Sequence, residues 1–263
     1  MNSPESQVFC GNSEIIYGND VITTHNSEVK LFKIELSSYN DIADILLKEY
    51  LTSVEAQRAQ KYRHTHDRNR FITCRSLLKY LMAKETGLEV SQIHFEKNSS
   101  HKPYFPLDRS IFFNIAHAGN YAIIAISKYE LGVDVEFMDP NFDFNEIIST
   151  VFNDKEIAFI ANSKDKRYWF YKFWTRKEAI VKAVGKGIDD ELHKIPVTEG
   201  NHCIPTSLLN SFETIKVFSF NLNADYIGAL AITEDLPHFA GFSFSPVPTS
   251  DELKYLLSSK NTN

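Results

Sequence analysis

The sequence predicts an α/β (α+β) fold made by pseudo-twofold tandem duplication, with two similar halves that each pack a small antiparallel sheet against helices. Each half has the same succession of signals: a capping-box helix start, a long helix that ends at glycine, and paired apolar strands. The strand pairs also align locally, because residues 120–123 (NYAI) occupy the place in one that residues 225–228 (DYIG) occupy in the other. We therefore expect a ligand site in the cleft between the halves.

Composition indicates a globular protein from a reducing compartment. The chain has 263 residues, of which 43% are apolar and 24% charged. Its cysteines, Cys10, Cys74 and Cys203, are far apart and form no Cys-x-x-Cys pair, which argues against a disulfide scaffold or a structural zinc site. Neither a signal peptide nor a long uncharged apolar segment is recognisable, so we expect a cytoplasmic protein that does not span a membrane.

Charge is distributed unevenly. A net charge of −6 makes nucleic acid an improbable partner. One segment is nevertheless basic, with only Asp67 opposing Arg58, Lys61, Arg63, Arg68, Arg70, Arg75 and Lys79. This concentration favours an anionic ligand of limited size, such as a nucleotide, although a solvated helix face is the commoner meaning of a charge run.

The apolar periodicity, the capping boxes and the terminating glycine predict the elements of the first half. We expect a loose polar arm at 1–28 and a first half at 29–130. Within that half we predict strands at 29–36, 93–95, 111–115 and 121–127, a helix at 39–51, a second helix beginning at the capping box 52–55, and a third at 67–86 ended by Gly87.

The second half, residues 131–263, repeats the plan. We predict a strand at 131–136, a loop at 139–145, a capping box at 153–156 and a long helix at 166–184 with Gly185 and Gly187 as stop signals. Strands at 215–222, 226–232 and 239–244 and a short helix at 252–257 complete the prediction.

The strand at 131–136 (LGVDVE) carries two acids on one face. Side chains alternate along a strand, so Asp134 and Glu136 point one way while Val133 and Val135 point the other. Neighbouring carboxylates repel and resist burial, and a divalent cation between them removes both problems. Such hard oxygen ligands suit Mg²⁺ or Mn²⁺ better than zinc. A solvated strand face is an equally good reading of this hexapeptide alone.

The long helix carries a second acid-containing face. Trp174, Glu178 and Lys182 recur every fourth residue and line one side of the helix. A Glu and a Lys at this spacing are also an ordinary stabilising pair, worth only a few tenths of a kcal/mol on a surface. Because the helix is apolar over a wide arc, we expect it to be buried, and its charged residues then need partners or a function.

A histidine follows a strand at the third informative segment, residues 113–119 (FNIAHAG). His117 is flanked by small residues, Ala116 and Ala118, which leave room for a ligand. A lone histidine is more often structural than functional.

Taken together, these segments resemble the 4′-phosphopantetheinyl transferases of the surfactin-synthetase-activating (Sfp) type. The similarity extends from about residue 29 to residue 245 and rests on three motifs in order: residues 114–117 (NIAH), 132–136 (GVDVE) and 174–182 (WTRKEAIVK). It implies a pseudo-dimeric enzyme, expected to act as a monomer, that binds coenzyme A and Mg²⁺ between its halves.

The resemblance also implies roles for single residues. Asp134, Glu136 and Glu178 match the metal-binding acids, and Glu178 and Lys182 match the catalytic pair. Residues that match the coenzyme A contacts are Arg58, Arg70, Arg75, Lys102, His117, Lys177 and Lys182. Ala116 and Ala118 depart from the family, which commonly has serines beside the histidine, and the departure implies lost hydrogen bonds to a phosphate.

The implied reaction moves 4′-phosphopantetheine from coenzyme A to a serine of an acyl or peptidyl carrier protein and releases adenosine 3′,5′-bisphosphate. The pathway that the carrier serves, whether fatty acid, polyketide or nonribosomal peptide synthesis, is not specified by these residues. Two alternatives use the same features: a Mg²⁺-dependent nucleotide phosphohydrolase, and a non-catalytic module that docks carrier proteins. The intact acids and Lys182 argue against mere docking, which needs none of them.

Overall fold

The computed structural model describes residues 4–13, 29–187, 191–233 and 244–260. The first half contains β2 (Val29–Glu35), α1 (Ala43–Tyr50), α2 (Ser53–Gln60), α3 (Thr65–Thr86), β3 (Glu96–Lys97), β4 (Pro103–Tyr104), β5 (Phe112–Ala118) and β6 (Tyr121–Ser127). The second contains β7 (Leu131–Phe137), α4 (Ile148–Val151), α5 (Asp154–Asn162), α6 (Lys166–Val184), β8 (Gly200–Pro205), β9 (Thr214–Asn221) and β10 (Tyr226–Ile232).

The ends of the chain add β1 (Glu5–Asn12), β11 (Phe244–Ser245) and α7 (Ser250–Lys260). Short 3-10 helices are η1 (Leu36–Ile42), η2 (Val90–Gln92), η3 (Phe144–Glu146), η4 (Leu192–Lys194) and η5 (Thr206–Leu209). None of the described helices is both long enough and apolar enough to cross a bilayer.

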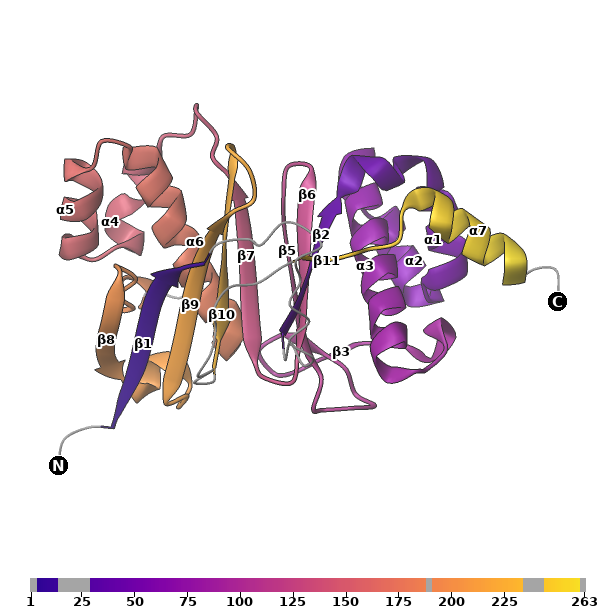
Figure 1. Ribbon diagram of the computed structural model, residues 1–263, viewed down its shortest axis with the longest axis horizontal. Coiled ribbons are helices and arrows are strands. Elements are labelled where there is room, and N and C mark those ends of the chain that lie inside the picture. Colours follow the sequence, from indigo (N-terminus) through magenta and orange to yellow (C-terminus); the bar gives the residue numbers. More distant parts are fainter. Residues whose placement is uncertain (1–3, 14–28, 188–190, 234–243, 261–263) are drawn as a thin grey trace.

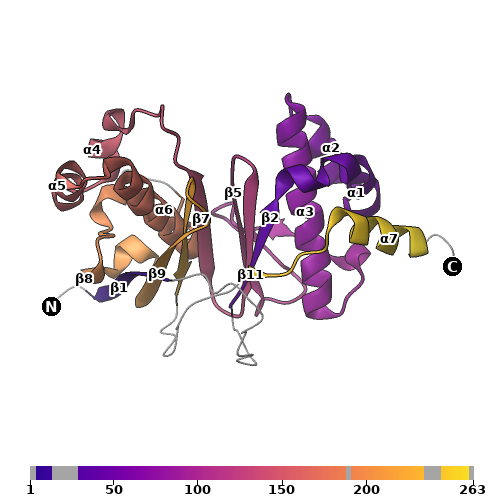
Figure 2. The ribbon, with the colours of Figure 1, turned by 45° about the horizontal axis from the view of Figure 1, so that its top comes forward.

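Two sheets occupy the middle of the molecule, and helices cover the outer side of each (Figures 1 and 2). One sheet has the strand order β7-β10-β9-β1-β8 and is covered by α4, α5 and α6; the other has the order β11-β2-β6-β5 and lies beside α1, α2, α3 and α7. One apolar cluster fills each helix–sheet interface, and a third, which includes Val133, Val135 and Phe220, fills the space between the sheets.

The predicted duplication is confirmed by the topology. Strands β2, β6 and β5 neighbour one another in the order that β7, β10 and β9 repeat in the second sheet. The hairpins also share a register, because Tyr121 pairs with Glu35, the last residue of β2, as Tyr226 pairs with Phe137, the last residue of β7. These two tyrosines meet edge to face, with ring centroids 4.9 Å apart.

The helix signals read from the sequence are confirmed where they are local. Thr52 and Asn153 each accept from the backbone of a glutamate three residues on, which returns the bond, so both capping boxes form. Gly87 and Gly185 end the long helices in the left-handed conformation, with φ of 72° and 69°.

A second parallel joins these helices. In each half the capping-box glutamate pairs with a buried lysine of the long helix, Glu55 with Lys79 at 2.9 Å and Glu156 with Lys177 at 3.0 Å. Each lysine stands at the same distance in sequence from the glycine that ends its helix, Gly87 or Gly185. The duplication therefore includes the polar anchors of the helices as well as the strand order.

The loose arm expected at 1–28 is wrong for residues 5–12. This stretch forms β1, which lies inside the second sheet, parallel to β9 and antiparallel to β8. Its buried positions alternate, with Ser6, Val8 and Cys10 facing inward, but a polar serine in the series hid the period-2 pattern from the sequence. Residues 14–28 of the expected arm lie outside the described residues.

The division into halves at 29–130 and 131–263 is also corrected at its end. Strand β11 pairs in parallel with β2, and Leu253 and Leu257 of α7 are buried in the core of the first half. The helix expected at 252–257 forms within α7. The strand expected at 239–244 falls, apart from Phe244, outside the described residues.

Smaller differences concern weak local patterns. Residues 93–95 form no strand, and the only pairing nearby joins β3 to β4 among the described residues. The helix expected at 39–51 is split, because η1 precedes α1. Strand β8 was not predicted, since Ile204 is its only buried residue and its pairing partner, β1, lies far away in sequence.

Candidate active site

Helix α6 lies unusually close to β7 because of one glycine. A Cβ placed on Gly132 would lie 2.1 Å from the carbonyl oxygen of Ala179 and 2.4 Å from the amide nitrogen of Ala183. These are backbone atoms of α6, so any side chain at position 132 would push the helix away. Residue 132 faces the same way as Asp134 and Glu136, and the close approach therefore brings the acids of β7 next to α6.

Helix α6 meets these acids with its least buried stripe. Trp174, Glu178 and Lys182 are half-buried, whereas their helix neighbours on both sides are buried. The indole Nε1–H of Trp174 donates to Oε1 of Glu136 at 3.1 Å, and the ammonium of Lys182 lies 2.6 Å from Oδ1 of Asp134. The helix face that carries Trp174, Glu178 and Lys182 thus lies against the acids of β7. Trp174, which we did not predict as a site residue, positions Glu136.

Asp134 is the most constrained of the acids. Asp134 is only 4% exposed. Its Oδ1 accepts from Lys182, whereas its Oδ2 is buried without a hydrogen-bond partner. A carboxylate oxygen that is both desolvated and unsatisfied is costly unless a ligand completes it. This oxygen is therefore the clearest sign that the site is built to hold a cation or a hydrogen-bond donor.

Burial makes the charged forms of the three acids costly. Burial, reinforced by the charge of Asp134, raises the pKa of Glu136 to about 7 and also raises the pKa of Glu178. Burial raises the pKa of Asp134 as well, although Lys182 opposes the shift. Burial disfavours the charged ammonium of Lys182, but the surrounding carboxylates, Asp134 first, outweigh it and raise its pKa.

The donor set fits a hard divalent cation. Three carboxylates influence one another's titration across β7 and α6, and Asp134 Oδ2 has no partner. The described residues hold no cluster of three His, Cys, Asp or Glu side chains already close enough to bind a metal ion. Asp134, Glu136 and Glu178 are the side chains that would hold such an ion.

The first half contributes His117 and Arg70 to the same region. His117 lies at the end of β5, and both Arg70 of α3 and Lys182 of α6 act on its titration. Although its ring reaches solvent, crowding by surrounding protein and the nearby Arg70 lower the pKa of His117. Arg70 is held by Asp67 at 2.8 Å. An anion between these groups would meet cationic or hydrogen-bonding side chains from both halves.

A side-chain hydrogen bond joins the two sheets beside the site. Strands β5 and β7 are both edge strands, and the amide of Val133 donates to the side-chain Oδ1 of buried Asn114 at 2.9 Å. The bond satisfies an edge N–H that has no strand partner and fixes the level of β7 against the strand that carries His117. Asn114 belongs to the NIAH motif, but its own role was not predicted.

Lys177 is not part of the site, contrary to our expectation that it contacts coenzyme A. Its side chain is fully buried and pairs with Glu156, itself fully buried, at 3.0 Å. It also donates to the carbonyls of Leu192 and Ile195, at 3.1 and 2.6 Å. All the donors of its ammonium are therefore used inside the protein.

Lys102 is likewise engaged elsewhere. Its ammonium lies 2.5 Å from Glu130 and donates to the carbonyl of Ala183, in the last turn of α6, at 2.8 Å. A cation at the carboxyl end of a helix satisfies a free carbonyl and favours the helix dipole. The structure thus places Lys102 as a link between the first half, the end of α6 and the start of β7, whereas we expected it among the coenzyme A contacts.

Arg58 and Arg75 form a separate group with the ring of Phe71. The guanidinium carbons lie 4.8 and 5.9 Å from its centroid. Arg75 is also paired with Glu55 at 3.4 Å, and burial lowers its pKa despite that partner. Arg75 therefore anchors α3 to α2, whereas Arg58 is exposed and remains available to a ligand.

The alanines that flank His117 point away from the site. Ala116 is buried, and Ala118 packs against the same apolar cluster between the two sheets. In the strand they alternate with His117, so a hydroxyl at either position would enter an apolar core. The expected loss of phosphate hydrogen bonds therefore has no counterpart in this geometry.

Comparisons with known proteins identify the family of this chain. A model of the 4′-phosphopantetheinyl transferase superfamily matches residues 130–231, and a model named 4′-phosphopantetheinyl transferase, N-terminal, matches residues 43–129. A 4′-phosphopantetheinyl transferase of Bacillus subtilis is 30% identical over 72% of this chain and 85% of its own length. The corresponding enzyme HetI of Nostoc is 29% identical over 64% and 73%.

The chain therefore belongs to the 4′-phosphopantetheinyl transferase family. A Synechocystis protein assigned the same activity has a higher identity, 34%, but the match covers only 61% of its length and 55% of this chain. The Sfp protein of Bacillus subtilis is 27% identical over 66% of its length.

Proposed function

We propose that this protein transfers the 4′-phosphopantetheine group of coenzyme A to a serine hydroxyl of an acyl or peptidyl carrier protein. The observation that carries the proposal is the set of buried acids on β7 and α6, with Oδ2 of Asp134 unsatisfied and Lys182 at their edge. Family membership supplies the reaction class, and the placement of His117 and Arg70 supports an anionic ligand that reaches both halves. We propose that the protein acts as a cytoplasmic monomer.

Asp134, Glu136 and Glu178 would hold Mg²⁺, with Mn²⁺ as an alternative. When bound, the ion supplies a positive charge that neutralises the diphosphate of coenzyme A and the growing charge on the phosphoryl oxygens. The acids fit this role because burial, reinforced at both glutamates by the charge of Asp134, raises their pKa values in its absence. His117 and Arg70, with exposed Arg58 as a further candidate, would hold the 3′-phosphate and adenine end.

Glu178 and Lys182 would act on the reacting atoms. The serine Oγ forms a bond to the β-phosphorus while the bond to the bridging diphosphate oxygen breaks, and adenosine 3′,5′-bisphosphate leaves with that electron pair. Glu178 takes the serine proton, directly or through an oriented water. The ammonium of Lys182 offsets charge on the phosphoryl oxygens.

Mass spectrometry of a carrier protein tests the proposal. An unmodified carrier mixed with this protein, coenzyme A and MgCl₂ should gain the mass of one phosphopantetheine. Asp134→Ala should abolish the gain while circular dichroism shows a retained fold, since the substitution removes the central acid of the site. A variant with wild-type activity at saturating Mg²⁺ would eliminate the proposed metal site. Hydrolysis of coenzyme A without a carrier would instead support the phosphohydrolase alternative.

A further inference from the structure

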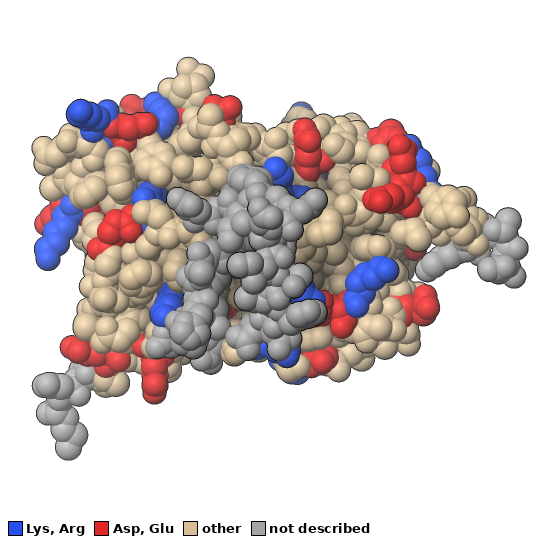
Figure 3. Space-filling view, in the orientation of Figure 1, with Lys and Arg blue, Asp and Glu red and all other residues tan. Residues whose placement is uncertain are grey.

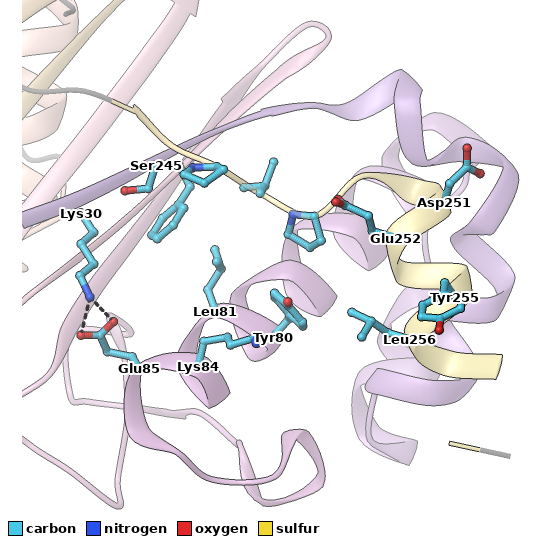
Figure 4. A pocket seen from close by; sticks show the side chains of 14 residues that line it. Lys30, Tyr80, Leu81, Lys84, Glu85, Ser245, Asp251, Glu252, Tyr255 and Leu256 are labelled. Atoms are coloured by element: carbon cyan, nitrogen blue, oxygen red, sulfur yellow. Dashed lines mark hydrogen bonds and ion pairs between the residues drawn. The ribbon is translucent and has the colours of Figure 1, made fainter. Parts of the chain in front are cut away.

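A second cavity lies in the first half, at a distance in the fold from the candidate active site. It has a volume of about 870 Å³ and lies between α3 and the C-terminal segment that runs from β11 into α7 (Figure 4). This volume falls within the range of ordinary small-molecule sites. Its floor includes Tyr80, Leu81 and Lys84 of α3, and its roof includes Val247 and Leu256.

The cavity occupies the duplicated position of the active site. Lys84 stands as far before Gly87 in α3 as Lys182 stands before Gly185 in α6, and the same alignment places Tyr80 at the position of Glu178. The shared strand register likewise equates Phe32 of β2 with Asp134 of β7. Phe32, Tyr80 and Lys84 all line the cavity. It is therefore the first half's version of the groove between strand and long helix.

The exchange of side chains changes the chemistry that this groove can accept. Phe32 and Tyr80 replace Asp134 and Glu178, so the acids that suit a divalent cation and its diphosphate are gone. The walls become apolar and aromatic, while the lysine is retained as Lys84. Such a surface suits an apolar body that carries a small anionic group.

The roof of the cavity is firmly attached. Tyr39 donates its hydroxyl to the carbonyl of Pro248 at 2.7 Å, and Lys254 pairs with Asp41 at 2.6 Å. Leu253 and Leu257 bury the inner side of α7 in the first-half core. The hollow therefore lies between two anchored elements, and closing it would require one of these contacts to break.

Among the described residues that line the cavity, Lys84 is the cation without an ion-pair partner. Glu85 is paired with Lys30 at 2.6 Å, and Glu252 caps α7 by accepting from the amide of Thr249 at 2.7 Å. The remaining lining acid, Asp251, lies 3.2 Å from Lys254. Lys84 has the ring of Tyr80 5.7 Å from its ammonium, and no carboxylate of the described residues lies within ion-pair distance. A ligand with a single negative charge would complement this arrangement.

We propose that this cavity binds a long unbranched carboxylate, with the head group on Lys84 and the chain along Leu81, Val247 and Leu256. Figure 4 shows the lining side chains spread from Lys30 of β2 to Tyr255 and Leu256 of α7. The site is separate from the catalytic groove and does not depend on the proposed function.

Calorimetric titration of the full chain with dodecanoate, below its aggregation concentration, tests the assignment. Saturable binding with one molecule per chain is expected, with Lys84→Gln weakening it roughly ten-fold and Lys128→Gln, an exposed lysine elsewhere, leaving it unchanged. Dodecanol, which has the same chain without a charge, should bind the wild type more weakly and should not distinguish Lys84→Gln from wild type.

Competition separates this cavity from the catalytic groove. Saturating coenzyme A with MgCl₂ should leave dodecanoate binding unchanged, because the two ligands occupy different halves of the duplication. Displacement by coenzyme A would place dodecanoate in the catalytic groove and overturn the assignment. It would also be overturned by an absence of saturable binding, or by equal affinity in the wild type and Lys84→Gln.

Discussion

Replacing Glu136 with glutamine should make the protein without metal more stable at alkaline pH. The pKa of Glu136 is raised from 4.5 to about 7, first by burial and then by the charge of Asp134. Between these two values the folded state binds more protons than the unfolded state, so the free energy of unfolding falls as pH rises through this window. Glutamine is neutral at every pH and removes that loss, while its oxygen can still accept from Trp174.

The size of the effect follows from the shift. Each pKa unit corresponds to about 1.4 kcal/mol, so complete conversion of the shift gives about 3 kcal/mol. Glu136 is half-buried and partly screened by solvent, so the full value is not expected. As pH rises through the window, the free energy of unfolding should fall by about 1–3 kcal/mol more in the wild type than in Glu136→Gln.

Urea unfolding of both proteins in EDTA, at pH values just outside each end of the window, measures this difference. Adding MgCl₂ at the alkaline end should stabilise the wild type more than the variant, because an ion that binds only the folded state shifts the equilibrium by mass action. If both proteins show the same dependence on pH, Glu136 does not carry the raised pKa and the electrostatic account of the site is wrong.

Three further substitutions test the structure around the site. Lys177→Met should lower the free energy of unfolding by about 3–5 kcal/mol, measured in urea, because it leaves Glu156 buried without its cation; coenzyme A affinity of the folded fraction should stay unchanged, and a selective loss of affinity would restore Lys177 to the site. Gly132→Ala should lower the free energy of unfolding by about 1–3 kcal/mol and reduce transfer, since backbone atoms of α6 must move. The control Gly11→Ala meets only the Phe9 ring and should lower the free energy of unfolding less, with both variants measured by thermal unfolding. Asn114→Leu should lower the free energy of unfolding in urea by about 1–3 kcal/mol, because the amide of Val133 loses its acceptor. A decrease no larger than that caused by the control Ile115→Val would contradict the proposed link between the sheets.

The sequence predicted most accurately the features that depend on residues close together in the chain. Capping boxes at Thr52 and Asn153 and the stop signals at Gly87 and Gly185 involve bonds within one turn, and all of them form. Strand β1 depends instead on pairing with β8 and β9, about two hundred residues away, and its polar positions gave no local signal.

The site shows the same limit at the level of single side chains. Lys177 and Lys182 lie on one helix within one motif, and the motif alone cannot say which of them faces a ligand. That choice depends on the packing of α6, which turns Lys177 toward Glu156 and two carbonyls at the ends of η4 and turns Lys182 toward Asp134. Lys102 illustrates the point again, since its partner Ala183 belongs to the other half.

The two ends of the chain exchange places in the fold: β1 completes the sheet of the second half, and β11 with α7 completes the layer of the first. A gene cut between β6 and β7 would therefore leave the second half without its inner strand β1 and the first half without the edge strand β11 and the helix α7. Each fragment would also carry an unpaired segment that belongs to the other. Shortening either terminus would weaken the half more distant in sequence, so affinity tags and fusion partners should be attached beyond β1 and α7 without removing any residue of either.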